Sequence, residues 1–132
     1  MVSYSQTVLV IEDSVAMRRI VTNLVKKFGF ANVLEAANGV SAMDIMGQNK
    51  VDAIITDWNM PEMDGLAFTR LLRANPKFNG VPILMITTEA AKEDILTALR
   101  NGVNNYVIKP FSADILKERL FRLLGIVEVP EG

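Results

Sequence analysis

The chain of 132 residues contains no cysteine and no histidine. Without cysteine it can form neither a disulfide bond nor a thiolate zinc site. Without histidine it can carry neither a Ser-His-Asp triad nor a zinc site of the HExxH type. No histidine of this chain can carry a phosphoryl group either. Thiol and imidazole chemistry are therefore excluded.

Long apolar runs and a strong charge of one sign are also missing. No segment approaches the about 18 uninterrupted apolar residues that a membrane-spanning helix requires. Residues 1–6 lack the basic and apolar regions of a signal peptide. The 14 Lys and Arg residues nearly balance the 15 Asp and Glu residues. We therefore expect a cytoplasmic protein without a nucleic-acid or membrane partner.

The composition is that of one packed domain. Apolar residues make up 50% of the chain and charged residues 22%, which is typical of a globular protein. The length also corresponds to about one domain. Because no linker or repeat interrupts the sequence, we expect a single domain over 1–132, with a core at about 7–124 and a short tail at 125–132. No large exposed apolar stripe is evident, so we expect a monomer.

Short apolar runs alternate with helical patterns. The runs are typical of strands buried on both faces, and they occupy residues 7–11, 33–36, 53–56, 81–86 and 105–108. Helices are expected after the caps Ser14, Asp64 and Ser112. The helix after Ser14 should end before Gly29, the helix after Asp64 before Pro76, and the helix after Ser112 at Leu124. Two more are expected over 39–47 and over 90–101, the latter ended by Gly102. This alternation predicts an α/β fold with a mostly parallel sheet, helices on both faces and right-handed crossovers.

Phe121 does not fit its predicted helix. It lies off the apolar stripe, which consists of Leu116, Leu120, Leu123 and Leu124. We expect the tail at residues 126–129 to fold over this ring, in preference to a partner surface.

Polar residues follow the carboxyl ends of four predicted strands. They are Glu12-Asp13, Asp57, Thr87-Thr88 and Lys109-Pro110. Ligands of open α/β sheets bind beyond these strand ends. The polar residues should therefore converge on one crevice.

This set of groups suits phosphoryl transfer. Clustered carboxylates repel one another and favour a bound cation. Oxygen ligands suit Mg²⁺, and Mn²⁺ would fit the same ligands. The Lys109 ammonium and the Thr87 hydroxyl add groups that stabilise a phosphoryl group. Asp57, between a buried strand and the loop 58–65, is the candidate nucleophile and would form an aspartyl phosphate.

The segments that hold these residues resemble response-regulator receiver domains, and among them the stand-alone chemotaxis regulators. They are VIEDSVAMRRIV, ITDWNMPEMDG, PILMITTEA and NYVIKPF. The resemblance implies a doubly wound, flavodoxin-like (βα)5 fold with five parallel strands in the order 2-1-3-4-5. It implies a phosphoacceptor signalling protein whose own chemistry is limited to self-phosphorylation and self-dephosphorylation.

The resemblance also implies the roles of single residues. Asp57 is the phosphoacceptor and a Mg²⁺ ligand, Asp13 binds the ion directly and Glu12 binds it through water. Asn59 offers its backbone carbonyl to the ion, and its side chain tunes dephosphorylation together with Glu89. The phosphoryl-contact and switch residues are Thr87, Lys109 and Tyr106. The Lys109-Pro110 bond is expected to be cis.

A partner-binding face is implied as well. It comprises Ala90, Lys92, Ile95, Tyr106, Ile108, Phe111 and Arg119. Of these, Ile95, Ile108 and Phe111 fit an ordinary core equally well. The implied partners are a CheA-like histidine kinase as phosphodonor, the flagellar motor switch as target, and a phosphatase.

The sequence departs from the resemblance at two positions. Glu12 stands where Asp is frequent, and the acid is kept. Thr88 is bulkier than usual and is expected to narrow access to Asp57.

The sequence also leaves further functions open. A flavin or nucleotide site is disfavoured, because the loop Glu12-Asp13-Ser14 repels phosphate and no Gly-rich motif is present. The chain could still act as a phosphate sink or as a phosphorylation-independent interaction module. It could also be the receiver half of a truncated transcription regulator.

Overall fold

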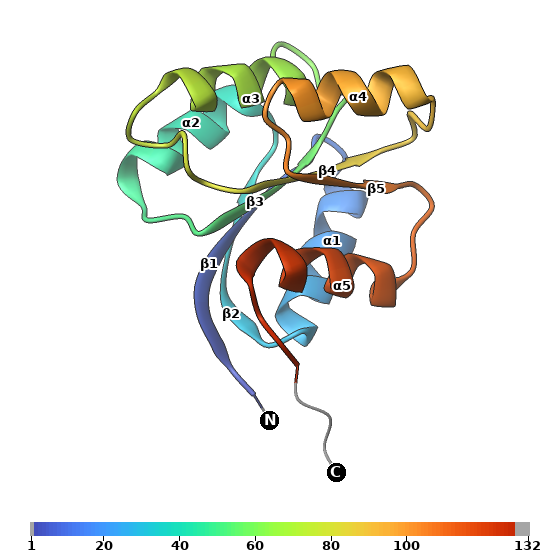
Figure 1. The fold of residues 1–132 in the computed structure, drawn as a ribbon. Helices are drawn as coiled ribbons and strands as arrows, with labels where there is room; N and C mark the ends of the chain where they lie inside the picture. Colours follow the sequence, from blue (N-terminus) through green and yellow to red (C-terminus); the bar gives the residue numbers. More distant parts are fainter. Residues whose placement is uncertain (1, 129–132) are drawn as a thin grey trace.

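The computed structural model describes residues 2–128, in which five strands alternate with five helices (Figure 1). The strands are β1 (Tyr4–Ile11), β2 (Phe30–Ala36), β3 (Ala53–Asp57), β4 (Ile83–Thr87) and β5 (Asn105–Ile108). The helices are α1 (Val15–Lys27), α2 (Gly39–Gln48), α3 (Gly65–Ala74), α4 (Lys92–Arg100) and α5 (Ala113–Leu124). All strand pairs are parallel and the order is β2-β1-β3-β4-β5, so the expected fold is confirmed.

The sheet separates two hydrophobic cores. Helices α2, α3 and α4 cover one face and helices α1 and α5 cover the other (Figure 1). Side chains alternate between the faces along each strand, so Leu9 and Ile54 enter the first core while Val8 and Ile55 enter the second. Because both faces are covered, the central strands β3 and β4 are apolar up to the polar residues at their carboxyl ends. Each helix within 2–128 is too short or too polar to cross a bilayer.

Side-chain caps begin four of the helices. Ser14, Asp64 and Ser112 accept the backbone N–H three residues on, as the sequence predicts. Asn38 caps α2 in the same way, which the sequence pattern did not reveal. Helix α4 has no side-chain cap and begins at Lys92, two residues later than expected.

Strands β1 and β2 begin earlier than the sequence predicts, at Tyr4 and Phe30. The two residues pair with each other, and the Tyr4 N–H donates to the Gly29 carbonyl at 2.9 Å. Gly29 adopts φ +115°, and a Cβ there would lie 2.7 Å from the Val2 carbonyl oxygen. Glycine at this position therefore permits the tight return into β2.

The expectation that Phe121 is an exposed ring is wrong, and the expectation that the tail folds over it is confirmed only at Ile126. Phe121 is 6% exposed, because the early start of β1 places the ring of Tyr4 against it. The Phe121 ring lies 5.3 Å from that of Tyr4 and 6.0 Å from that of Phe30, between centroids. Ile126 of the tail packs on the same cluster, and its N–H donates to the Phe121 carbonyl. Val129, also assigned to this contact, lies outside the described residues.

Candidate functional site

Two buried carboxylates lie at the carboxyl ends of adjacent strands. Ile11 of β1 pairs with Thr56 of β3, and the next residue along each strand direction is Glu12 or Asp57. Glu12 is 5% exposed and Asp57 is 8% exposed. Asp13 is exposed, and its carboxylate joins the other two, with one oxygen from each residue within 4.8 Å of the others. The structure thus gathers three acidic groups at the carboxyl end of the sheet.

Lys109 reaches this cluster from the end of β5. Its Nζ lies 3.0 Å from Asp57 Oδ2 and 3.6 Å from Glu12 Oε2. The lysine backbone is fixed by a 2.8 Å hydrogen bond from its N–H to the Thr87 carbonyl, and the Lys109-Pro110 bond is cis as expected. One ammonium facing three carboxylates leaves an excess of negative charge. The cluster therefore attracts a further cation.

The pKa of Glu12 reports this excess. Burial and the neighbouring Asp57 carboxylate raise the pKa of Glu12 to about 7, while Lys109 acts in the opposite direction. The Ser14 N–H, 3.3 Å from Glu12 Oε1, also favours the charged form. An all-oxygen donor set with surplus charge fits a hard divalent ion. The three acidic residues therefore form a group that can hold a metal ion.

The chain leaves Asp57 through a tightly folded loop. The Gly65 N–H donates to the Trp58 carbonyl at 2.8 Å, which closes the loop over residues 58–65. A Cβ at Gly65 would collide with the Asp57 carbonyl oxygen, so only glycine fits this approach. The same carbonyl accepts the Thr56 hydroxyl at 2.9 Å. The backbone of Asp57 is thus held while its side chain faces the cluster.

The remaining predicted site residues lie on β4, on β5 and on the loops that follow β3 and β4. Thr87 is 2% exposed and lies one residue beyond Ile86, the strand partner of Asp57. Its hydroxyl accepts the Glu89 N–H at 3.0 Å. Asn59 and Glu89 are exposed on the loops after β3 and β4. Tyr106 of β5 is half-buried and packs against the core beneath α2, α3 and α4.

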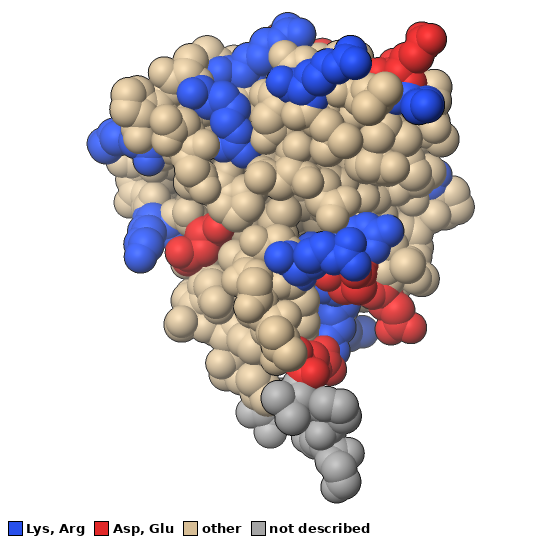
Figure 2. All heavy atoms as spheres, in the orientation of Figure 1, with Lys and Arg blue, Asp and Glu red and all other residues tan. Residues whose placement is uncertain are grey.

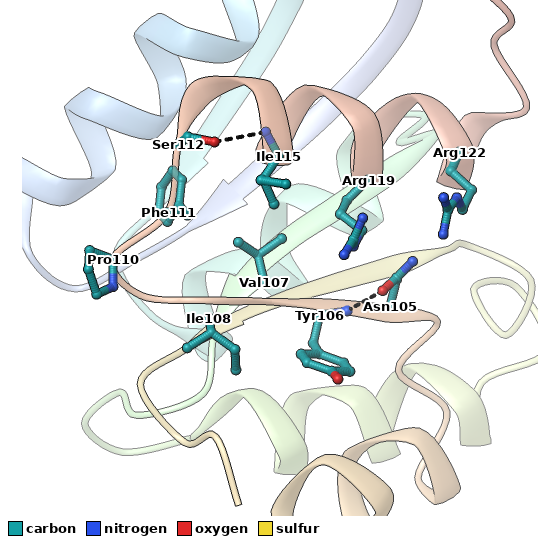
Figure 3. A pocket seen from close by; sticks show the side chains of 10 residues that line it. All are labelled: Asn105, Tyr106, Val107, Ile108, Pro110, Phe111, Ser112, Ile115, Arg119 and Arg122. Carbon is teal, nitrogen blue, oxygen red and sulfur yellow. Dashed lines mark hydrogen bonds between the residues drawn. The ribbon is translucent and has the colours of Figure 1, made fainter. Parts of the chain in front are cut away.

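The expected partner face surrounds a surface pocket of about 440 Å³ between β5 and α5 (Figure 3). Tyr106, Ile108, Phe111 and Arg119 line it. In Figure 3 the Ile108 and Tyr106 side chains point to one side of β5 and Val107 to the other. Ala90 and Lys92 are exposed, and Ile95 is half-buried. All seven residues expected for this face are accessible at least in part.

Charges on this face are mixed. Arg119 and Arg122 both pair with Glu118 along α5. Figure 2 shows basic and acidic side chains beside each other over α5, and basic side chains scattered along the helices at the top of the view. The face in view thus lacks a single broad basic patch, in keeping with the charge balance of the sequence.

Sequence reasoning missed the role of Arg18. Its Nη1 donates to the Glu12 carbonyl at 2.8 Å, and its Nε lies 3.3 Å from Glu35 Oε1. The available signal was a basic residue one turn into the helix that follows the acidic pair. That signal is weak, because many helices carry an arginine there without such a contact.

Comparison with known proteins decides the family. Residues 8–121 match the response regulator receiver domain. The chain belongs to the response regulator receiver family. A CheY homologue of Campylobacter jejuni is 49% identical over 118 residues, which cover 89% of this chain and 91% of that protein. Chemotaxis protein CheY1 of Helicobacter pylori is 48% identical, with 89% and 95% covered.

Solved structures agree with this assignment. Chemotaxis protein CheY4 of Vibrio cholerae superimposes with a TM-score of 0.86 at 32% identity, covering 92% of this chain and 100% of that chain. The receiver domain of a Pseudomonas aeruginosa sensor histidine kinase gives 0.83 at 30% identity, covering 92% and 99%. That receiver was solved with a magnesium ion coordinated in its active-site cleft.

The family assignment settles the class of function. This receiver is a two-component response regulator domain, closely related to CheY chemotaxis regulators. It is a signalling protein and not a classical enzyme, which rules against a flavin or nucleotide-binding function. CheY-like receivers accept phosphoryl groups from histidine kinases and act on partner proteins.

Proposed function

We propose that Asp57 of this receiver accepts a phosphoryl group from a histidine kinase, with Mg²⁺ bound at the acidic cluster, and that the modified protein changes its affinity for a partner. One observation carries the proposal. The Asp57 carboxylate is nearly buried, contacts the Lys109 ammonium at 3.0 Å, and shares a metal-sized cluster with Glu12 and Asp13.

The roles of the side chains follow from their chemistry. Asp13, Asp57 and the Asn59 backbone carbonyl would bind Mg²⁺ directly and Glu12 through water; Mn²⁺ suits the same oxygen donors. Once bound, the ion supplies positive charge to the carboxylates and to the phosphoryl oxygens. An Asp57 carboxylate oxygen attacks the phosphorus while the bond from phosphorus to the donor breaks. Lys109 and the Thr87 hydroxyl donate hydrogen bonds to the phosphoryl oxygens.

The new phosphoryl group acts on the protein through Thr87. A Thr87 hydroxyl that turns toward the phosphoryl group gives up its bond from the Glu89 N–H, which loosens the loop after β4. Tyr106 lies on the neighbouring strand, opposite Met85. The phosphoryl group favours the arrangement in which Thr87 and Lys109 contact it, and Tyr106 carries that population shift to the partner face.

The partners of this receiver are proposed from its relatives. Because these relatives are named chemotaxis proteins, we propose a CheA-like kinase as phosphodonor and the flagellar motor switch as target, in the cytoplasm. The motor switch would bind the partner face around α4, β5 and α5, which includes the pocket between β5 and α5. The exposed Asn59 and Glu89 side chains lie on the loops after β3 and β4, from which they would control the access of hydrolytic water or of a phosphatase.

Trp58 provides the test, because it is the sole tryptophan and follows Asp57 directly. Its fluorescence is recorded during a Mg²⁺ titration and then with beryllofluoride, an analogue of the bound phosphoryl group. We expect saturation by Mg²⁺, a second change that requires both Mg²⁺ and beryllofluoride, and loss of the second change in Asp57→Asn. A wild-type protein that is silent at millimolar Mg²⁺ and beryllofluoride would instead be a phosphorylation-independent interaction module.

A further inference from the structure

Arg18 connects helix α1 to the backbone of the acidic site. Its guanidinium donates to the Glu12 carbonyl through Nη1 at 2.8 Å and pairs with Glu35 through Nε at 3.3 Å. The Arg18 side chain is 19% exposed and the Glu35 side chain is 45% exposed, so the bond to the Glu12 carbonyl is better shielded from water than the pair with Glu35. A planar guanidinium can satisfy two such partners at once in one fixed geometry. Arg18 therefore joins α1 to the end of β1 and the end of β2.

The Glu12 carbonyl belongs to the peptide unit that joins the two neighbouring acids. Because that unit is planar, the orientation of the carbonyl sets the direction in which Asp13 leaves β1. The Glu12 N–H already donates to the Ala36 carbonyl at 3.0 Å, so the bond from Arg18 fixes the following peptide. Among residues 2–128, no group donates a hydrogen bond to the exposed Asp13 carboxylate. The backbone alone therefore directs it.

We propose that Arg18, anchored by Glu35, is a positioning residue for the divalent-cation site. It orients the Glu12–Asp13 peptide, and through it the Asp13 carboxylate relative to those of Glu12 and Asp57. The guanidinium holds a backbone carbonyl and not the ion. This inference rests on the proposed function, since it assigns a residue to the same Mg²⁺ site.

Positioning and simple electrostatics predict opposite effects when Arg18 is removed. A positive charge near a cation site repels the cation, so loss of that charge alone would strengthen Mg²⁺ binding. Loss of a contact that orients the ligands weakens binding, typically by about 10-fold or more. The direction of the change in Mg²⁺ affinity therefore tells the two roles apart.

The experiment measures the Mg²⁺ dissociation constant by Trp58 fluorescence in Arg18→Ala, with Arg19→Ala as the matched control. Arg19 is the next residue on α1 and is exposed, so its removal deletes the same charge without the contact. We expect Arg18→Ala to weaken Mg²⁺ binding about 10-fold. We expect Arg19→Ala to stay within about 2-fold of wild type or to bind slightly tighter.

A second variant, Arg18→Lys, keeps the charge but cannot hold both partners with one planar group. We expect an intermediate loss of affinity, whereas a purely electrostatic role predicts wild-type binding. Denaturant unfolding without Mg²⁺ checks the fold of each variant, and Arg18→Lys decides the question if Arg18→Ala does not fold. Unchanged or tighter binding in folded Arg18 variants overturns this inference and leaves the proposed function standing. A wild-type chain that binds no Mg²⁺ overturns both.

Discussion

The two ends of the parallel sheet differ in their side chains, with charged groups at the carboxyl end and aromatic rings at the amino end. At the carboxyl end, Glu12, Asp57 and Lys109 place two carboxylates and an ammonium in contact, each largely shielded from water. At the amino end, Tyr4, Phe30 and Phe121 form an aromatic cluster with ring centroids 5.0 to 6.0 Å apart. Figure 1 shows the start of β1 and the segment after α5 running toward this same end.

The contrast shows that the residues that favour folding and the residues that carry the chemistry lie at different ends of the sheet. Burying charge opposes folding unless each group finds a partner, and the single ammonium of Lys109 carries too little charge to balance the two buried carboxylates. Burying aromatic rings in edge contact favours folding. Packing at the aromatic end therefore helps to offset the unfavourable free energy of burying charge at the acidic end. The protein can thus keep a charged, reactive cluster. Substitutions at the two ends should have opposite effects on function and stability.

The largest expected effect is on function, at the acidic end. Asp57→Asn should abolish phosphoryl uptake from acetyl phosphate, because the amide is no nucleophile. Its stability should not fall greatly, since the loss of the Lys109 ion pair is offset by relief of the repulsion with Glu12. Intact-mass spectrometry and urea unfolding measure the two quantities. Phosphoryl uptake by the Asp57→Asn variant would show that another residue is the acceptor.

The reverse result is expected at the aromatic end. Phe121→Ala should lower the free energy of unfolding by about 3–5 kcal/mol, because it opens a cavity beside Tyr4 and Phe30. Beryllofluoride affinity of the folded variant should stay close to wild type. Phe121→Leu is the control and should cost less, because it retains most of the apolar volume. A loss below about 1 kcal/mol for Phe121→Ala would mean that the ring is not part of the core.

Proton binding at Glu12 should have an effect of intermediate size on the free energy of unfolding. The folded-state pKa of about 7 lies above the ordinary value of 4.5, so the folded protein binds more protons between these values. The resulting stabilisation is complete below pH 4.5 and is lost as the pH rises to about 7, by about 3 kcal/mol in total.

Two measurements test this pH dependence. The difference in unfolding free energy between wild type and Glu12→Gln, followed from about pH 4.5 to about pH 8 without Mg²⁺, should show the loss. Mg²⁺ affinity of the wild type should rise as the pH increases through about 7, because the ion competes with the proton. A pH-independent difference between the two proteins would place the Glu12 pKa near its ordinary value.

The smallest effect is expected in the tail. Ile126 is half-buried on the aromatic cluster. Ile126→Ala should therefore lower the unfolding free energy by only about 1 kcal/mol, and by less than Tyr4→Ala. Urea denaturation of the two variants measures the difference. If the tail substitution costs more, the segment after α5 covers Phe121 more than β1 does.

Most of the fold follows from the sequence, because central strands covered on both faces must be apolar up to their carboxyl ends. Residues 53–55 illustrate this, and the caps Ser14, Asp64 and Ser112 mark the helix starts. The early start of β1 escaped this reasoning, since residues 4–6 include polar side chains and only Tyr4 among them has a strand partner, Phe30 of β2. The error at Phe121 follows directly. A helical wheel cannot show that Tyr4 extends the apolar surface beneath α5.

The acidic cluster is predictable for a different reason. Parallel strands bring their carboxyl ends to the same edge of the sheet, so Glu12, Asp57 and Lys109 must lie at that edge whatever the details of packing. The contact from Arg18 depends on the direction of one backbone carbonyl, which the position of a basic residue in the helix does not predict. The order of strands and the roles of Asn59, Glu89 and Tyr106 follow from the family resemblance, whereas the roles of Asp57, Thr87 and Lys109 in phosphoryl transfer also follow from the chemistry of their side chains.

The central claim is that Asp57 is the phosphoacceptor, and one measurement tests it most directly. Wild-type protein is incubated with acetyl phosphate and Mg²⁺, then treated with borohydride, which reduces an acyl phosphate to an alcohol and so marks the modified residue permanently. Peptide mass spectrometry then locates the mark. We predict homoserine at position 57, dependent on Mg²⁺ and absent without acetyl phosphate. A mark at any other carboxylate, or none at all, would contradict the account.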